Sequence, residues 1–201
     1  MLIKTLEVGH IGTNCYIVTD ESTLECAVID PGDESNTILD YLEDNKLKCR
    51  RIFITHGHFD HTLAAPAVRN KTGAEMYISE ADVELACQHN AKLRQEDFRL
   101  YEDGDILGVG SLEFQVIATP GHTPGGVTLL CGDTLFTGDT LFKDSCGRTD
   151  FEGGDMNTEL CSLRRLAELP GDYEVYPGHM DSTTLERERR FNYYMQYSNE
   201  E

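Results

Sequence analysis

The chain has 201 residues, of which 17 are Lys or Arg and 36 are Asp or Glu, so its formal net charge at pH 7 is -19. This length fits one domain with a sizeable core, and the balance of apolar and charged residues is typical of a soluble globular protein. Such a negative charge repels phosphate backbones and anionic lipid, and no basic patch in the sequence offsets it, so we expect neither a nucleic-acid nor a membrane partner.

The first half of the chain alternates short apolar strands with helices. We predict one helix capped by Ser35, a second over residues 61–71, and a third that Ser79 and Asp82 open as a capping box and that runs to about residue 93. The strands predicted in this half cover residues 2–8, 15–19, 26–30, 51–55 and 76–78.

The second half repeats this order of strands followed by helices. Its predicted strands cover residues 105–109, 112–118, 127–131, 134–137 and 173–176, and its predicted helices cover residues 157–169 and 183–196. No low-complexity linker or break in composition separates the halves, so we predict a single domain over residues 1–201. Two halves of this kind favour two sheets packed together with helices outside.

The cysteines and the N-terminus indicate a compartment. There are seven cysteines, an odd number, and none forms a CxxC pair, which favours reduced, mostly buried thiols. The residues after Met1 lack the apolar segment of a signal peptide, and no window approaches the roughly 20 apolar residues that a membrane span needs. We therefore predict a cytoplasmic protein.

A short stretch rich in histidine follows the apolar run Ile52–Ile54. His56, His58, Asp60 and His61 place four potential metal ligands within six residues. Imidazole nitrogens and carboxylate oxygens suit a divalent ion such as zinc, and imidazole also suits iron. Because neighbouring side chains on a short loop point in different directions, one ion cannot easily use all four. Two ions are the simpler solution.

Three further residues of the ligand type, His122, Asp139 and His179, each follow a predicted strand in a turn that contains glycine. Side chains at strand ends on one edge of a sandwich can converge into one cleft. Taken singly, each residue could be structural, and Asp139 could simply cap its turn. His10 and His89 lack this setting, and we expect His89 on the surface.

Together the seven groups match the number that two adjacent ions need. The first ion would be held by His56, His58 and His122, the second by Asp60, His61 and His179, and Asp139 would bridge both.

At superfamily level these motifs resemble the metallo-β-lactamase superfamily. The resemblance rests on the HxHxDH loop, the later His122, the Gly-Asp at Asp139 and the Pro-Gly-His at His179, and it runs from Ile29-Asp30-Pro31-Gly32 to His179. It implies an α+β fold, an αββα four-layer sandwich of two mixed β-sheets flanked by helices. It also implies a site at one edge for two divalent metal ions, zinc first, with iron or manganese as alternatives.

Within the superfamily the chain looks most like the glyoxalase II (hydroxyacylglutathione hydrolase) branch. The stretch Leu141–Phe151 and the residues after His179 are similar to that branch. Asp139 stands where zinc β-lactamases usually carry a Cys, so antibiotic hydrolysis is not expected. The chain departs from glyoxalase II at two places. Gly57 interrupts the THHHxDH motif of that branch. Only a short segment follows His179, where glyoxalase II has a basic helical domain that holds glutathione. The chain thus resembles short, single-domain relatives, and thioester chemistry is expected with the thiol carrier left open.

This resemblance implies a hydrolase in which a metal-bridging hydroxide attacks the carbonyl of a small-molecule thioester, such as an S-acylglutathione. Asp60 and Asp139 are its predicted catalytic carboxylates. Asp30 is a candidate to orient a ligand imidazole, or else only forms the turn before Pro31. By similarity to the family, Arg148 is a candidate contact for a substrate carboxylate, and a structural salt bridge is an equal alternative. Asn14 is a candidate to line the cleft.

Three other functions compete with this prediction. The first is a mononuclear-iron persulfide dioxygenase, a relative with a similar stretch at Gly147–Phe151 that uses only two His and the Asp. The second is a related esterase or lactonase. The third is a non-catalytic metal-binding or interaction protein. The basic cluster Arg187, Arg189 and Arg190 could contact an anion or form a solvated helix face. The oligomeric state is left open.

Overall fold

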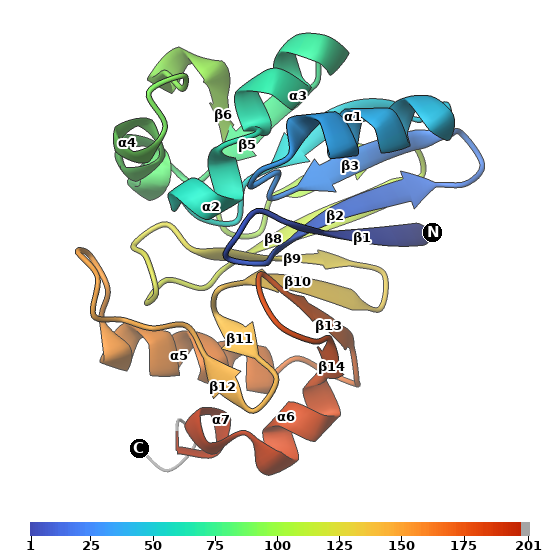
Figure 1. Ribbon diagram of the computed structural model, residues 1–201. Helices are drawn as coiled ribbons and strands as arrows, with labels where there is room; N and C mark the ends of the chain where they lie inside the picture. Colours follow the sequence, from blue (N-terminus) through green and yellow to red (C-terminus); the bar gives the residue numbers. More distant parts are fainter. Residues whose placement is uncertain (198–201) are drawn as a thin grey trace.

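The computed structural model describes residues 1–197, and two mixed β-sheets form its centre (Figure 1). In the first sheet the strands follow one another in chain order, antiparallel from β1 to β3 and parallel from β3 to β6. Its members are β1 (Leu2–Val8), β2 (Thr13–Asp20), β3 (Glu25–Ile29), β4 (Lys48–Phe53), β5 (Glu75–Ile78) and β6 (Phe98–Leu100).

The second sheet has the order β14-β13-β10-β9-β8-β7. Only β10 and β13 pair in parallel, and the other neighbours are antiparallel. Its members are β7 (Ile106–Val109), β8 (Leu112–Ala118), β9 (Val127–Cys131), β10 (Thr134–Gly138), β13 (Glu174–Pro177) and β14 (Thr183–Thr184). A separate ribbon pairs β11 (Leu141–Phe142) with β12 (Ser145–Cys146).

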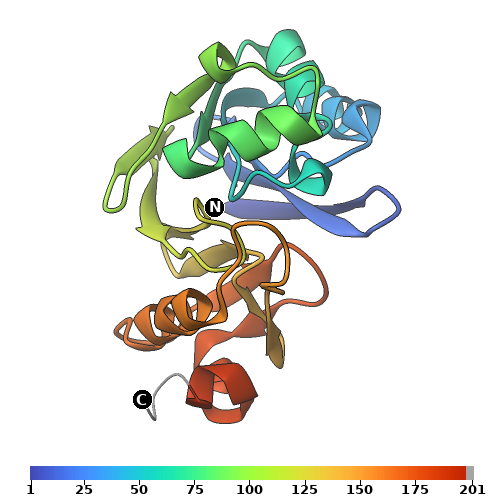
Figure 2. The ribbon, with the colours of Figure 1, turned by 90° about the vertical axis from the view of Figure 1, so that its left-hand side faces the viewer.

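Helices cover the outer face of each sheet, which completes four layers and confirms the predicted αββα sandwich (Figures 1 and 2). The first sheet carries α1 (Ser35–Asp44), α2 (Phe59–Thr62), α3 (Ala65–Thr72) and α4 (Glu80–His89), and the 3-10 turn Gln95–Asp97 follows α4. The second sheet carries α5 (Met156–Ala167), α6 (Leu185–Phe191) and α7 (Tyr193–Tyr197).

Apolar side chains fill the three spaces between the layers. Strand β2 shows how: Cys15 and Ile17 face the helices, whereas Tyr16 and Val18 face the second sheet. A strand buried on both faces reads as a continuous apolar run, which is why β2 is visible in the sequence. Burying each large apolar side chain contributes about 1.5–3 kcal/mol to stability.

Two predicted helices of the first half have different boundaries in the structure. The helix expected over residues 61–71 is split into α2 and α3, because Pro66 lies in the first turn of α3 and suits only a helix start. Helix α1 begins at Ser35, so Ser35 is not its cap. The preceding residue, Glu34, is in the left-handed conformation and makes no side-chain capping bond.

The capping box predicted at Ser79 and Asp82 is wrong. Ser79 precedes α4 but makes no capping bond, and Asp82 is used by the candidate site described below. The helix also ends at His89, short of residue 93.

The helix predicted over residues 183–196 is also divided. Its first two residues form β14 against β13, and Thr184 then caps α6 by accepting a hydrogen bond from the Arg187 N–H. Asn192 interrupts the helix, and its side-chain oxygen accepts from the Tyr194 N–H at 3.0 Å at the start of α7.

The remaining predicted strands and the helix at α5 match the structure within a few residues, whereas β6, β11 and β12 are too short to have been predicted. The predicted single domain ends at residue 201, and residues 198–201 lie outside the described range, so this boundary stays a prediction. No helix within residues 1–197 has the length and apolar character to cross a bilayer. All seven cysteines are free thiols.

Candidate metal centre

The ends of four strands carry the predicted ligands to one edge of the sandwich. Strand β4 leads into the loop of His56 to His61, β8 leads to His122, β10 to Asp139 and β13 to His179. Strands β8, β10 and β13 end at the same edge because β10 is parallel to β13 and both β8 and β10 are antiparallel to β9. The structure therefore brings all seven predicted residues together.

The seven side chains form groups whose ligand-type atoms lie within 4.8 Å of one another: His56, His58 and His122; Asp60, His61 and His179; and His56, His61 and Asp139. The first two groups have the membership predicted for the two ions. One oxygen of Asp139, Oδ2, lies 3.5 Å from His122 Nε2 and 3.5 Å from His179 Nε2. Asp139 thus lies between the two groups.

Hydrogen bonds on the outer nitrogens of three imidazoles leave the inner nitrogens facing the cluster. His61 Nδ1 bonds to Asp30 Oδ2 at 2.9 Å, and His122 Nδ1 bonds to the Arg148 carbonyl at 2.6 Å. His179 Nδ1 lies 3.3 Å from the Gly12 carbonyl. A partner on one ring nitrogen selects the tautomer in which the other can act as a ligand.

Two buried atoms at the centre lack a hydrogen-bond partner within residues 1–197: His56 Nε2 and Asp139 Oδ1. Leaving a buried polar atom unpaired costs about 1–3 kcal/mol, so native structures rarely do so without a reason. A divalent cation between the two groups would satisfy both atoms. The residues present therefore fit the divalent metal ions that a His and Asp cluster of this kind takes.

The pKa values of the side chains differ between the two ligand groups. Burial, with the nearby His122 ring, lowers the pKa of His58 to about 3, and burial beside the other rings also lowers the pKa of His56. These two side chains are neutral imidazoles at pH 7, the form that binds metal. Burial alone would also lower the pKa of His61, but the carboxylates of Asp139 and Asp30 outweigh it and raise that pKa to about 9.

The second ligand group differs because it contains a carboxylate that stays ionised. Burial acts to raise the pKa of Asp60, but the hydrogen bond from His179 and the charge of His61 hold it well below its usual range. Asp60 Oδ2 lies 3.2 Å from His179 Nε2 and also accepts a hydrogen bond from Thr13 Oγ1 at 3.1 Å. This group therefore offers an ionised carboxylate beside two imidazoles as candidate metal ligands.

Asp30 is buried next to the cluster and holds Thr55 and His61 in place by hydrogen bonds. Its carboxylate accepts from the Thr55 N–H at 2.7 Å and from the Thr55 hydroxyl at 2.6 Å, besides the bond to His61. Its φ of 50° is unusual for a residue other than glycine and costs energy, which the three bonds offset. The structure thus places Asp30 where the prediction puts it, behind a ligand imidazole.

Two buried carboxylates that the sequence analysis did not assign to the site hold the ligand loops. Asp82 on α4 accepts from the N–H groups of Gly57 at 2.8 Å and Gly125 at 2.7 Å, and from the Thr123 hydroxyl at 2.7 Å. Glu159 on α5 accepts from the His122 N–H at 2.9 Å. The His122 loop is therefore held from both helical layers.

Glycine is required where the loops approach most closely. A Cβ on Gly178 would lie 2.2 Å from Asp139 Oδ1, and a Cβ on Gly32 would lie 1.6 Å from the backbone oxygen of Asp60. Any larger residue at either place would push a predicted ligand out of the cluster. Glycine at these positions thus lets the loops that carry the predicted ligands pack closely against one another.

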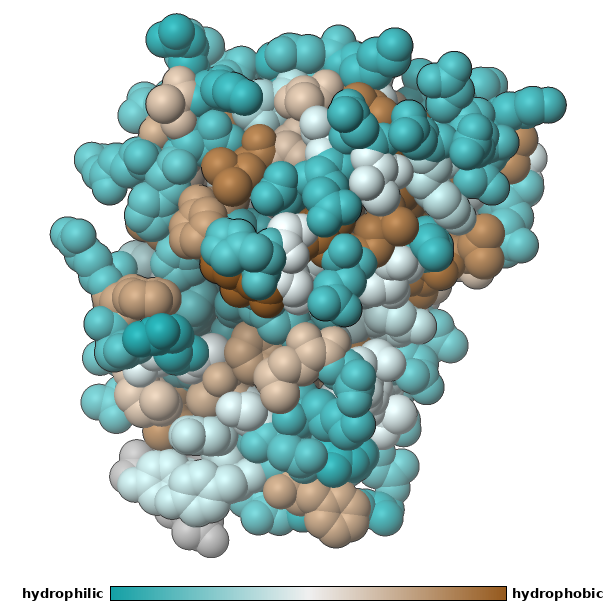
Figure 3. Space-filling view, viewed as in Figure 1, coloured by the Kyte–Doolittle hydropathy of each residue, from teal (hydrophilic) through white to brown (hydrophobic). Residues whose placement is uncertain are grey.

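A cavity of about 820 Å³ opens over the cluster. Figure 3 shows apolar residues among hydrophilic ones across the middle of this face of the molecule. The side chains that line the cavity come from the turn between β1 and β2, from the ligand loops, from α4, and from β11 and the stretch after β12; they include Ile11, His58, Phe59, Asp60, Leu85, Gln88, His89, His122, Asp139, Phe142, Arg148, Phe151, Glu152, His179 and Met180.

Of three further residues considered in the sequence analysis, only Asn14 lies elsewhere than predicted. Arg148 lines the cavity but also pairs with Asp150, so both of its predicted roles have support in the geometry. His89 is exposed as expected, yet its ring lies 5.9 Å from that of His58 at the cavity rim. Asn14 is buried away from the lining and donates to the carbonyls of Pro177 and Met180, which fixes the His179 loop.

The basic cluster near the C-terminus has intramolecular partners. Arg187 pairs with Asp144, Arg189 donates to carbonyls at the end of α5, and Arg190 pairs with Glu186. This cluster lies apart from the cavity lining.

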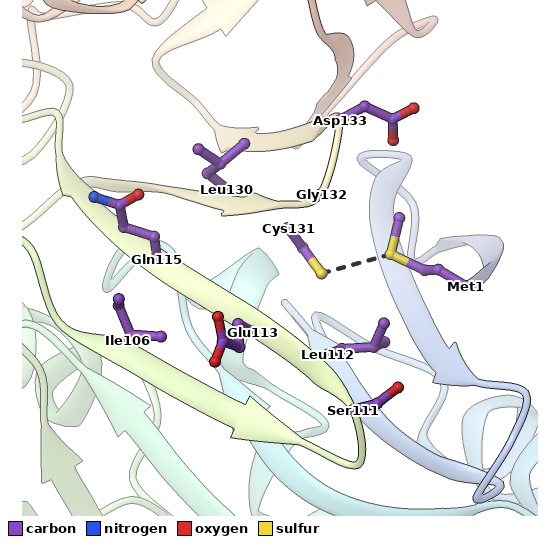
Figure 4. Close-up of a pocket in the computed structure, with 10 residues that line it drawn as sticks. All are labelled: Met1, Ile106, Ser111, Leu112, Glu113, Gln115, Leu130, Cys131, Gly132 and Asp133. Atoms are coloured by element: carbon purple, nitrogen blue, oxygen red, sulfur yellow. Dashed lines mark hydrogen bonds between the residues drawn. The ribbon is translucent and has the colours of Figure 1, made fainter.

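A second cavity, of about 590 Å³, lies at the opposite ends of the strands (Figure 4). It lies between the first residue of the chain and the turns of the β7–β8 and β9–β10 hairpins, and Cys131 Sγ lies 3.5 Å from Met1 Sδ in its wall. None of the metal-ligating groups found among residues 1–197 lies there.

A profile of the metallo-beta-lactamase superfamily matches residues 8–179, a range that includes every residue of the cluster. The chain belongs to the metallo-β-lactamase superfamily. It is therefore a metal-dependent hydrolase of the metallo-β-lactamase type, whose fold implies divalent metal ions held by the His and Asp cluster.

Relatives within the superfamily carry several names. The chain is 30% identical to the hydroxyacylglutathione hydrolase GloC of Haemophilus influenzae over 96% of its own length and 97% of the relative. A solved structure of the BLEG-1 B3 metallo-beta-lactamase is 30% identical, with a TM-score of 0.87 and coverage of 96% of this chain and 99% of that one.

Two further solved structures are similar over most of the chain. ETHE1 from Myxococcus xanthus is 34% identical with a TM-score of 0.84, and covers 96% of this chain and 84% of its own. TTHA1623 in a di-iron-bound form is 32% identical with a TM-score of 0.84, over 95% and 99% of the two chains.

Proposed function

We propose that this protein hydrolyses small-molecule thioesters with the help of two divalent metal ions, zinc being the first candidate. The observation that carries the proposal is that two buried atoms without a hydrogen bond, His56 Nε2 and Asp139 Oδ1, lie where the two ligand groups meet. The cluster also forms the floor of a cavity large enough for a small substrate.

Each ion would be held by one group of side chains, with Asp139 shared. His56, His58 and His122 would hold the first ion, and Asp60, His61 and His179 the second. When bound, the ions supply Lewis acidity, which polarises a carbonyl group and lowers the pKa of water towards neutrality.

The chain's own residues orient the reactants. Asp60 and Asp139 accept hydrogen bonds from the attacking water and so direct it at the carbonyl carbon. The Thr13 hydroxyl holds Asp60 in place, and Asp30 holds His61. The leaving thiolate needs no general acid, because a thiol has a pKa near 8.5.

Two relatives support parts of this proposal. GloC is named as a hydroxyacylglutathione hydrolase, which favours a thioester substrate here. TTHA1623 has been solved in a di-iron-bound form, which favours two ions in a similar cluster and keeps iron as an alternative metal.

The test is an assay of the metal-loaded protein against S-D-lactoylglutathione, simple acyl thioesters, an aryl ester, a lactone and a β-lactam, with metal content measured on the same sample. We expect thioester hydrolysis that a chelator abolishes and added zinc restores. Hydrolysis of the ester, the lactone or the β-lactam without thioester turnover would contradict the proposal. The β-lactam is included because of the similarity to BLEG-1.

A mononuclear-iron persulfide dioxygenase is the second candidate, favoured by the stretch Gly147–Phe151 at the cavity. That activity would need only two His and one Asp, and it would leave most of the cluster without a function. Oxygen uptake with glutathione persulfide, at one iron per chain, would establish it and end the hydrolase proposal.

A further inference from the structure

The mouth of the cavity exposes apolar side chains that contribute nothing to the core. Ile11 is 46% exposed, Phe59 36%, Phe151 47% and Met180 61%, and all four line the cavity. Apolar side chains that gather around a cleft mark a surface where an apolar ligand can be removed from water.

These side chains flank both halves of the cluster. On the side of His58, the Phe151 ring lies 5.5 Å from the His58 ring. On the other side, the Phe142 ring lies 6.2 Å from the His179 ring, and Met180 follows directly in the chain. A substrate whose carbonyl reaches the cluster therefore has apolar walls on either side.

Charges in the cavity disfavour an anionic substrate. Asp60, Asp139 and Glu152 are the acidic residues of the described lining, and Arg148 is its one residue with a permanent positive charge. Arg148 is already engaged: its Nε and Nη2 each donate to a carboxylate oxygen of Asp150 at 2.7 Å, and its guanidinium stacks 4.0 Å from the Phe151 ring. This bidentate pair uses two of the five N–H donors of the guanidinium and offsets its charge.

We propose that the site takes thioesters with an apolar, uncharged acyl chain on a neutral thiol carrier, and that Asp150 sets this preference by neutralising Arg148. The inference deepens the proposed thioesterase function and depends on it. Glutathione carries carboxylates away from its thioester group, and the described lining has no lysine and no unpaired arginine to bind them.

The first experiment measures kcat/KM of the zinc-loaded protein with acetyl, butanoyl and hexanoyl thioesters of N-acetylcysteamine, beside S-D-lactoylglutathione. Because the added methylenes are buried against the half-exposed rim, kcat/KM should rise about tenfold from the acetyl to the hexanoyl thioester. Lactoylglutathione should be the poorest substrate. Equal rates along the series, or lactoylglutathione as the best substrate, would overturn the inference while leaving the thioesterase proposal intact. No hydrolysis of any thioester by protein that holds zinc would refute the thioesterase proposal and this inference with it.

A matched pair of variants tests the apolar rim. Met180→Gln keeps the length of an exposed side chain at the cavity, and Met156→Gln makes the same change on α5, outside the lining. We expect Met180→Gln to raise KM for the hexanoyl thioester about threefold with acetyl unaffected, and Met156→Gln to change neither. An equal effect of both variants would overturn this role of the rim.

A second pair tests Asp150. Asp150→Asn releases Arg148, and Asp181→Asn makes the same change beside Lys143, which pairs with Asp181 at 3.3 Å outside the lining. We expect Asp150→Asn to lower KM for S-D-lactoylglutathione about tenfold, the scale of a charge-assisted hydrogen bond, and to leave KM for the acetyl thioester of N-acetylcysteamine unchanged. An unchanged KM for lactoylglutathione would show that Asp150 does not set the preference.

Discussion

Asp82 and Gly125 lie 43 residues apart in the chain and are joined by a hydrogen bond of 2.7 Å, from the Gly125 N–H to Asp82 Oδ1. The other oxygen of Asp82 accepts from Gly57, inside the HxHxDH loop. One buried carboxylate thus sets the spacing between the two loops that carry His56, His58 and His122.

Asp82→Ala should weaken the first ligand group without touching a ligand. The change leaves the N–H groups of Gly57 and Gly125 unpaired, so we expect about 3 kcal/mol lower stability and at least tenfold weaker zinc binding. Asp82→Asn should retain part of the stability and part of the zinc affinity, because the amide oxygen of Asn can still accept a hydrogen bond. Urea unfolding and competition with a chelator measure the two effects. Zinc affinity that matches wild type in a folded Asp82→Ala protein would contradict this role.

Asp30→Asn should impair the second group through His61. An amide can donate to His61 Nδ1 instead of accepting from it, which favours the tautomer with its proton on Nε2, the nitrogen that faces the cluster. We expect a loss of about 10–100-fold in metal affinity, measured by titration of the metal-free protein. Asp33→Asn is the control, because Asp33 lies nearby on the same turn and outside the ligand groups.

Asp139→Ala should affect both ions at once. Because Asp139 lies between the two groups, its loss should reduce the affinity for metal and remove nearly all thioester hydrolysis. Metal content and kcat on the same preparation provide the check. Turnover like that of wild type would refute the bridging role.

Asp20, which lies at the far end of the sandwich, should make the stability of the protein depend on pH. The Ser22 hydroxyl, the Ser111 N–H and the Ser22 N–H all donate to this carboxylate and hold its pKa well below the usual range. A lowered pKa contributes stability that is present above the unfolded pKa of about 4 and is lost as the pH falls towards the folded value.

Asp20→Asn should therefore be less stable than wild type at pH 7, and the difference should shrink as the pH falls below about 4. Urea unfolding at intervals from pH 7 to pH 3 measures it. A difference that stays constant over this range would show that the charge of Asp20 contributes nothing.

Much of the fold and of the candidate site could be predicted from local patterns. Strands such as β2 are visible because burial on both faces demands continuous apolar residues, and the ligand loop stands out because His and Asp gather in so few positions. His122, Asp139 and His179 could be singled out because each follows a strand beside glycine.

Features that depend on distant partners could not be predicted in this way. Asp82 has the sequence context of a capping residue, yet it bonds to loops 25 and 43 residues away. Glu159 lies on an amphipathic helix, and only the fold shows that it meets the His122 N–H. The division of the last helix depends on pairing of β14 with β13, which no local pattern encodes.

The central claim is that seven side chains from four strand ends hold two divalent ions. The most direct test is the number of zinc ions bound per chain after reconstitution and removal of free metal, measured by elemental analysis against protein concentration. Two ions per chain is the predicted result, and one ion or none in the folded protein would contradict it.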